Sequence, residues 1–194
     1  MLDAAAELIA AGGLASMTLA AIGERSGYSR GLVTARFGSK EGLVDALIHR
    51  VWRMLHDRGV VPLSGEAPGL PGLLALVDGI RELTEQAPGE ARALFALMFE
   101  ALGQDPALRQ RMARFHDAMA AEIATTLRRG HDDGSVWADA DPERGAALVV
   151  ATLDGLAFSW LLAPDSIDLA AGYADLGRLI EQRFAPPVDP PPAG

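Results

Sequence analysis

Closely spaced helix boundaries crowd the first 40 residues and limit what this part of the chain can fold into. A side-chain oxygen that would cap the first amides of a following helix stands at Thr18, Ser29 and Ser39. Glycines interrupt the helical pattern at positions 12, 13, 27 and 38. The predicted elements are short helices at 2–11, 18–25 and 29–37, and a longer one from Ser39 to about Arg58. Short helices joined by tight turns predict a small helical module at this end of the chain.

The rest of the chain shows the 3.6-residue period of amphipathic helices. Apolar stripes predict helices at 72–86, 89–103 and 105–130. Asp105-Pro106 and Asp141-Pro142 each resemble an N-cap followed by proline at the first helical position. Because no segment shows the alternation of a strand, the predicted fold class is all-α, with about nine helices.

The segment 142–163 is unusual because it is apolar over most of its circumference. Large residues form one stripe, and small residues form a second, at Ala147, Ala151, Gly155 and Ser159. A helix that is apolar on more than one face is expected to be buried on more than one face. A final helix is predicted at 166–184, and the proline-rich tail 185–194 is predicted to be disordered.

Composition excludes several classes of protein. The 194 residues contain no cysteine, which excludes disulfides, thiolate metal sites and thiol nucleophiles. The four histidines show no metal-site spacing, and the sequence has no phosphate-binding glycine loop. Its one Gly-x-Ser-x-Gly match, Gly27 to Gly31, follows a predicted helix rather than the strand that a nucleophile turn requires. We therefore predict no enzyme, no catalytic residue, no metal site and no cofactor. No apolar run approaches the roughly 20 residues of a membrane span, so we expect a soluble, cytoplasmic protein without membrane contact.

The formal charge of −9 is unevenly distributed along the chain. Residues 1–51 contain five basic and five acidic residues, so the remaining residues carry the whole negative charge. Within the first part, the segment from Tyr28 to Lys40 holds three cations and no acid, and Lys40 is the only lysine. A small cationic patch on an acidic body is compatible with DNA binding, because only the contacting face must be positive.

Two short helices joined by a turn at Gly27 match a helix-turn-helix, whose second helix enters the DNA major groove. The burial pattern predicts an inward set of Leu19, Ile22, Val33 and Phe37. It predicts an outward or flanking set of Arg30, Gly31, Thr34 and Arg36. The outward set is small or cationic, as a groove-facing surface requires.

The segment Ser29-Arg-Gly-Leu-Val-Thr-Ala-Arg-Phe-Gly-Ser-Lys-Glu41 resembles the recognition motif of the TetR family of transcriptional regulators. The similarity is strong over residues 2–50 and compatible in helix number and order beyond them. It implies a DNA-binding domain at 1–50, a helical ligand-binding and dimerisation domain at 51–184, and the tail at 185–194. The sequence departs from the family at Thr34, often an aromatic residue, and at Ala35, often histidine or another polar residue.

The resemblance assigns roles to eight positions in contact with DNA: Thr18, Ser29, Arg30, Gly31, Leu32, Thr34, Arg36 and Lys40. Thr18 and Lys40 are expected to hold phosphates, which fix register without reading bases. Arg36 could contact either a base or a phosphate, and we favour the phosphate. Arg30 is expected to read guanine through a bidentate contact, and Leu32 to touch a thymine methyl group. Gly31 would allow close approach of the helix backbone. For Thr18 and Ser29, a purely capping role remains an alternative.

The family analogy also predicts an effector site and a dimer interface. Candidate residues of the effector site are Phe95, Met98, Phe99, Phe115, His116, Met119, Asp154, Phe158 and Trp160. Most of them would equally fit a hydrophobic core. The helices near 142–163 and 166–184 resemble those of the family's dimer bundle, although the first would also fit a core helix of the monomer.

The predicted function is that of a ligand-responsive regulator, in which a dimer represses transcription from a palindromic DNA operator. A small apolar or amphipathic effector would displace the helix from Ser39 to Arg58 and release the DNA. The alternative is a helical small-molecule-binding or scaffold protein whose helix-turn-helix is vestigial, which the departures at Thr34 and Ala35 support.

Overall fold

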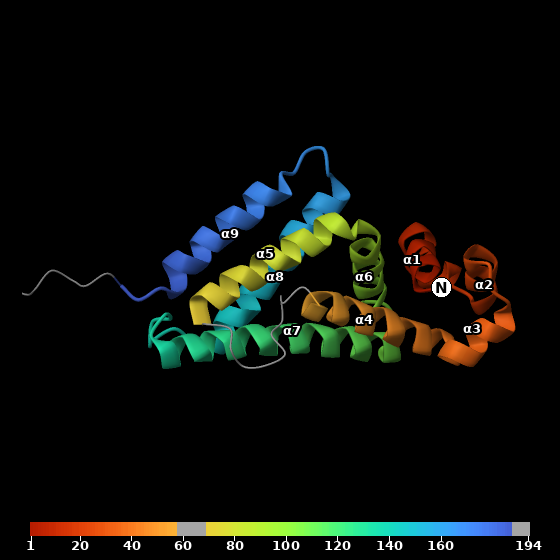
Figure 1. The fold of residues 1–194 in the computed structure, drawn as a ribbon, viewed down its shortest axis with the longest axis horizontal. Coiled ribbons are helices and arrows are strands. Elements are labelled where there is room, and N and C mark those ends of the chain that lie inside the picture. Colours follow the sequence, from red (N-terminus) through yellow and green to blue (C-terminus); the bar gives the residue numbers. More distant parts are fainter. Residues whose placement is uncertain (58–68, 188–194) are drawn as a thin grey trace, which may run out of the picture. The chain divides into compact units, whose positions relative to one another are not determined.

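The computed structural model describes residues 1–57 and 69–187, and every regular element in these ranges is a helix (Figure 1). The first four helices are α1 (Leu2–Ser16), α2 (Leu19–Ser26), α3 (Arg30–Phe37) and α4 (Lys40–Asp57). The others are α5 (Gly69–Gln86), α6 (Pro88–Glu100), α7 (Pro106–Asp133), α8 (Pro142–Leu162) and α9 (Leu169–Phe184). The predicted all-α fold class is confirmed. Residues 188–194 of the predicted tail lie outside the described residues.

The predicted N-caps are present. The hydroxyl oxygens of Thr18, Ser29 and Ser39 accept hydrogen bonds from main-chain amides three residues later, at 3.1, 3.2 and 3.2 Å. The carboxylates of Asp105 and Asp141 cap α7 and α8, each directly before a proline. These caps act over three residues, so the sequence specifies them locally.

Distant residues bond to the main chain at two helix boundaries. The predicted break at Gly12-Gly13 is present, whereas the start of α5 differs from the prediction. Helix α5 starts at Gly69 rather than at residue 72. The amides of Gly69 and Leu70 donate to the Asp133 carboxylate and the Ser135 hydroxyl, both at 2.9 Å. Helix α1 runs past the predicted end at residue 11, with a break at Gly12-Gly13. After that break the amide of Leu14 donates to a carboxylate oxygen of Glu100 on α6, at 2.8 Å.

The chain divides into two compact units, of which the first comprises residues 1–55 and 83–115. Its core joins α1 to α4 with α6 and the start of α7. Ile22 and Val33 are fully buried there, as predicted, and Leu19 and Phe37 pack partly buried against the same core. The helix-turn-helix therefore shares its core with helices that follow much later in the sequence.

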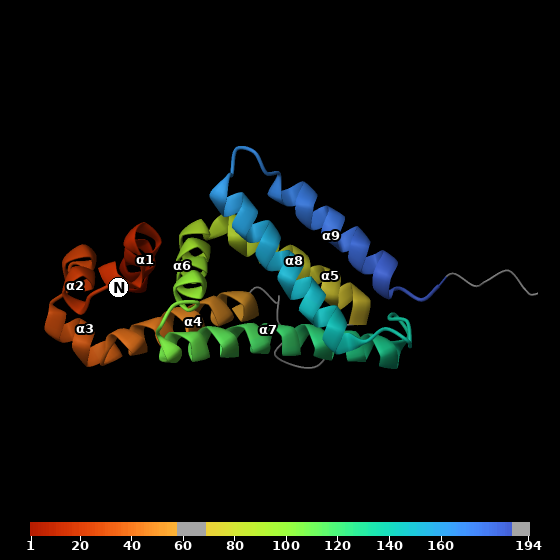
Figure 2. The same ribbon diagram turned by 180° about the vertical axis from the view of Figure 1, so that it is seen from behind.

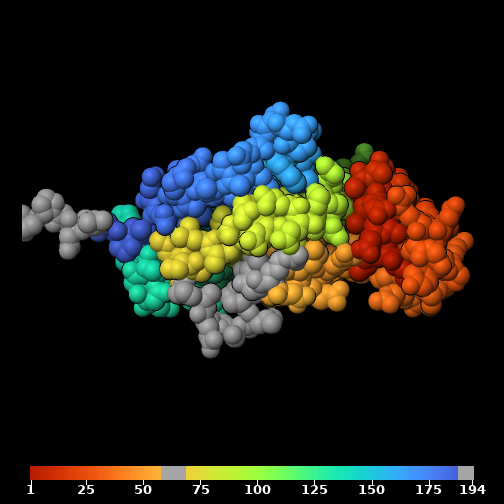
Figure 3. All heavy atoms as spheres, turned by 45° about the horizontal axis from the view of Figure 1, so that its top comes forward, coloured from red at the N-terminus to blue at the C-terminus, as the bar shows by residue number. Residues whose placement is uncertain are grey.

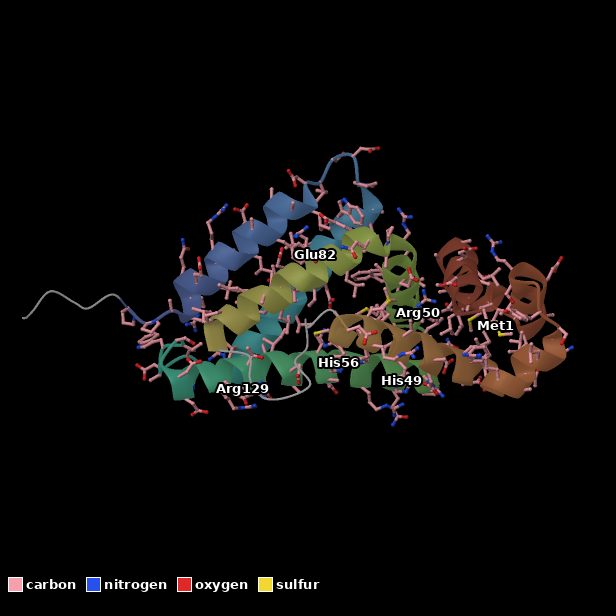
Figure 4. All side chains as sticks on the ribbon, in the orientation of Figure 1. Met1, His49, Arg50, His56, Glu82 and Arg129 are labelled. Atoms are coloured by element: carbon pink, nitrogen blue, oxygen red, sulfur yellow. The ribbon has the colours of Figure 1, made fainter. Side chains whose placement is uncertain are left out.

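Arg50 on α4, labelled in Figure 4, joins three helices of the first unit. Its guanidinium contacts Asp3 on α1 at 2.5 Å and Glu90 on α6 at 2.7 Å. The hydrogen bond from Arg50 lowers the pKa of the Asp3 carboxyl. A second pair, Arg111 to Asp45 at 2.8 Å, joins the start of α7 to α4. Helix α4 is thus fixed by charge to three of its neighbours.

The second unit comprises the described parts of residues 56–82 and 116–194. Helices α8 and α9 lie side by side in it, as Figures 1 and 2 show from opposite sides. Figure 3 shows α9, in blue, against the yellow and green residues of α5. The core side of α8 carries Val149 and Leu153, and that of α9 carries Tyr173, Leu176 and Ile180.

Helix α8 buries only one of its apolar faces among the described residues. Three members of the predicted small stripe, Ala147, Ala151 and Gly155, are exposed. The neighbouring Leu148 and Leu162 are 59% and 73% exposed. The expectation of burial on more than one face is therefore not met within this chain, because its second face has no neighbour there.

The expectation about membrane-spanning segments needs a correction. Helix α8 has 21 residues and is long and apolar enough to cross a membrane, judged by length and composition alone. The helix contains many small residues, which raise its mean hydropathy. The sequence therefore shows no obvious run of large apolar side chains. A helix of a soluble protein with one face in a core and one face in an interface passes the same test.

Candidate nucleic-acid interface

The predicted helix-turn-helix is formed by α2, a turn and α3. The turn contains Gly27, whose φ of 75° lies in the left-handed region that suits glycine. Val33 points into the core, and the other residues of α3 up to its last are exposed: Arg30, Gly31, Leu32, Thr34, Ala35 and Arg36. The structure therefore presents the predicted outward residues on one accessible helix.

Two glycines without a predicted role, Gly23 and Gly42, hold α3 in place. A Cβ added at Gly23 of α2 would lie 2.7 Å from the main-chain oxygen of Tyr28, just before α3. One added at Gly42 of α4 would lie 2.1 Å from the main-chain oxygen of Phe37, the last residue of α3. Both distances are shorter than the closest contact that a carbon atom and a non-bonded oxygen atom can make. No local pattern signals these contacts, because the constraint comes from main chain in the neighbouring helix.

The cations of this region fall into two groups. Arg25 pairs with Glu7 at 2.5 Å, and Arg50 pairs with Asp3 and Glu90, so their charges are compensated. Arg30, Arg36 and Lys40 make no ion pair with any residue in the described ranges, and the Arg36 guanidinium lies 5.6 Å from the centre of the Phe37 ring. Uncompensated positive charge is thus concentrated on α3 and the start of α4.

Helix N-termini add to this positive character. Lys40 is the first residue of α4, where the helix dipole favours an anion and the Ser39 hydroxyl already accepts the Gly42 amide. Glu41 stands beside it, and hydrogen bonds from the Ser39 hydroxyl and from its own amide lower the pKa of its carboxyl. Thr18 and Ser29 occupy the N-caps of α2 and α3. The phosphate-binding roles of these residues stay predictions.

Thr34 cannot fill the place of the aromatic residue that is usual in the family. Its hydroxyl donates to the main-chain oxygen of Arg30 at 2.9 Å, so its proton is used within the helix. Donation to a phosphate would require this bond to break. The exposed apolar residues near it are Leu32 and Tyr28, with 48% and 51% of their surface accessible.

The predicted effector residues of the first unit differ in burial. The Phe115 ring packs against Trp52 of α4 with centroids 5.5 Å apart and is 8% exposed. Phe99 lies 52% exposed, whereas Phe95 and Met98 are half-buried. Trp52 was not among the predicted residues, because it lies on the helix that the family analogy assigns to signal transmission.

In the second unit, the structure brings together two predicted polar residues. His116 Nε2 on α7 lies 3.4 Å from a carboxylate oxygen of Asp154 on α8. Burial raises the pKa of the Asp154 carboxyl, and the neighbouring His116 opposes the shift. Met119, one turn after His116, is buried, Phe158 is exposed, and Trp160 is half-buried. The ligand-binding roles of all these residues stay predictions.

Comparison with known proteins identifies the family. Residues 1–47 match the model of bacterial regulatory proteins of the tetR family, and residues 71–185 match that of the BetI-type transcriptional repressor C-terminal domain. The HTH-type transcriptional regulator BetI of Burkholderia mallei is 29% identical over 97% of this chain and 93% of its own length.

Solved structures share the fold. SmeT in complex with triclosan aligns with a TM-score of 0.76 at 22% identity, covering 100% of this chain and 96% of that chain. A regulator from Saccharomonospora viridis in complex with choline aligns with a TM-score of 0.74 at 24% identity, covering 95% of both chains. Proteins of the matched families regulate transcription and are not enzymes. On the two family-model matches, which together span most of its length, the chain belongs to the TetR family of ligand-responsive, DNA-binding transcriptional regulators.

Proposed function

We propose that this chain acts in the cytoplasm as a homodimeric repressor that binds a palindromic operator and is released by a small amphipathic effector. The observation that carries the DNA-binding part is the uncompensated charge of Arg30, Arg36 and Lys40 around the exposed face of α3. In a vestigial motif we would expect these cations to form ion pairs with nearby acids, as Arg25 and Arg50 do.

Roles on DNA follow from the position of each residue. Lys40 and Thr18 stand at helix N-termini on either side of α3, where they would bind phosphates together with free amides. Arg30 starts α3, and a guanidinium there can donate two hydrogen bonds to one guanine. Arg36, stacked on Phe37, would contribute a further phosphate contact. Ser29 and Thr34 would support α3 through their helical hydrogen bonds.

Lys40→Ala tests the phosphate contact. Each lost contact removes one released counterion, so the log–log slope of affinity against salt should become shallower by about 0.9 per protomer. Affinity should fall for all sequences alike. The measurement is fluorescence anisotropy on the promoter region beside the protein's own gene, across a salt series.

Arg129→Ala is the matched control for this experiment. Arg129, labelled in Figure 4, lies on α7 in the second unit and has no ion pair with a described residue. Its removal changes net charge equally but should leave the slope unchanged. Equal slopes for the wild type and Lys40→Ala would contradict the contact, and absence of specific binding by the wild type at low salt would favour the vestigial alternative.

Gly31→Ala distinguishes the effect of this position on protein stability from its effect on how closely α3 can approach DNA. No atom other than the Ser29 hydroxyl, at 3.8 Å, lies near an added Cβ, so alanine should stabilise α3 by up to about 1 kcal/mol. The same methyl group would stand between the helix backbone and the DNA. We expect a raised melting temperature together with weaker operator binding. A variant that is more stable and binds as well as the wild type would show that Gly31 is not needed for close approach.

The dimer proposal rests on the exposed side of α8. Ala147, Ala151 and Gly155 form a stripe of small residues where a second helix could approach closely, and large apolar residues border it at Leu148 and Leu162. Soluble monomers rarely expose such a continuous apolar surface. Two recognition helices, one per protomer, would then meet half-sites about 34 Å apart on DNA.

Ala151→Glu should disrupt this dimer, because twofold symmetry places the new charge opposite its own copy. Sedimentation velocity should show a monomer, and operator affinity should fall by about 100-fold or more with loss of the second half-site. Ala121→Glu, on an exposed position of α7 in the same unit, is the control and should remain dimeric. A dimeric Ala151→Glu protein would place the interface elsewhere.

For the effector, we assign the orienting polar group to the His116–Asp154 pair. Burial disfavours the charged form of Asp154, and only His116 is seen to compensate it among the described residues. A cationic group on an amphipathic effector would take over that role and stabilise the carboxylate. The choline bound to the Saccharomonospora viridis regulator is a suitable probe. Effector binding would displace α4 and so change the separation of the recognition helices.

Asp154→Asn should weaken the response to choline by about 10- to 100-fold, the value of a charge-assisted contact, while leaving operator binding intact. The uncharged isostere 3,3-dimethyl-1-butanol should fail to release operator from the wild type. The control is Asp117→Asn, an exposed acid on the same helix as His116. Release by triclosan but not by choline, or an unchanged choline response in Asp154→Asn, would contradict a cationic effector.

A further inference from the structure

The exposed side of α3 contains an apolar depression that the phosphate and guanine contacts leave unexplained. Its walls are Met1, Leu2, Tyr28, Leu32, Ala35, Arg36 and Phe37, which we call the reading depression. Leu32 and Tyr28 are the two large hydrophobic residues of 1–57 that are strongly exposed, at 48% and 51%. The Leu32 side chain is neither buried in the core nor able to form a hydrogen bond, so its exposure on α3 is unfavourable unless it contacts an apolar group.

Polar groups around Leu32 offer few donors for reading bases. The Thr34 hydroxyl donates to the main-chain oxygen of Arg30. The Arg36 guanidinium lies over the Phe37 ring, and both residues line the depression. Ala35 carries only a methyl group. Hydrogen-bond readout in this region therefore depends on Arg30, Arg36 and the Tyr28 hydroxyl, whereas Leu32 and Ala35 can contact only apolar atoms.

The major groove presents one apolar group, the C5-methyl of thymine. Arg36 lines the depression and has no ion pair in the described ranges, so its charge favours a polyanion over an apolar protein segment. We propose that Leu32, flanked by Tyr28 and Ala35, selects one thymine in each operator half-site by packing against its C5-methyl. This inference rests on the proposed DNA-binding function and adds the chemical feature that the protein selects.

Replacement of thymine by uracil isolates the methyl group, because it preserves base pairing and all hydrogen-bonding edges. The operator is first selected from a random duplex library with the full-length protein. Each thymine is then replaced in turn by deoxyuridine, and affinity is measured by anisotropy. For one symmetry-related pair of thymines, affinity should fall about fourfold per half-site and about 15-fold when both are replaced, as expected for one buried methyl group each.

Variants of Leu32 test whether this side chain causes the loss of affinity that uracil produces. Leu32→Ala removes an exposed side chain and should leave the fold intact while reducing the uracil penalty to below about twofold. Leu32→Met keeps an apolar contact and should preserve the penalty. Leu102→Ala, which truncates another exposed leucine of the first unit, is the matched control and should behave as the wild type.

The outcomes separate the two levels of the proposal. A library that yields no enriched sequence would overturn the proposed function and this inference together. An enriched operator in which no uracil replacement matters would overturn the inference alone. The same holds if the penalty in Leu32→Ala equals that of the wild type, since the methyl group would then be read by another residue.

Discussion

The position of the recognition helix α3 depends on two places where main chain passes a glycine too closely for any side chain. With only eight residues, α3 is far below the length at which an isolated helix is stable, and Val33 is its only fully buried residue. Gly23 lets α2 approach the chain just before α3, and Gly42 lets α4 approach the chain just after it. These contacts fix both ends of α3, so everything that the helix presents to DNA depends on them.

Charge pairing then determines which side of this module can bind an anion. The helix-turn-helix region is neutral overall, yet its acids are not shared equally among its cations. Glu7 and Asp3 neutralise Arg25 and Arg50, which serve the packing of α1 and α4. The cations of α3 are left without acids. A protein with a strongly negative total charge can therefore attract DNA to one face, because interactions beyond about 8 Å are largely screened at physiological salt.

The sequence predicts what nearby residues control and misses what distant residues control. The caps at Thr18, Ser29 and Ser39 act over three residues, and the predicted helix starts there are correct to within one residue. The start of α5 depends on Asp133, more than 60 positions away, and was misplaced. The need for glycine at Gly23 and Gly42 likewise comes from packing. Aromatic residues such as Phe115 have the same helical spacing in a core as in a binding site, so sequence alone does not separate the two.

The packing of α6 shows why the DNA-binding module is not independent of the body. Glu100 accepts a hydrogen bond from Leu14, directly after the break in α1, and Glu90 shares Arg50 with Asp3. Helix α6 thus holds α1 at two separate points within one hydrophobic core. Helices α4, α5 and α7 each contribute residues to both compact units. The core that supports α3 includes Leu108 and Met112 of α7, so a substitution at either position acts on that core directly.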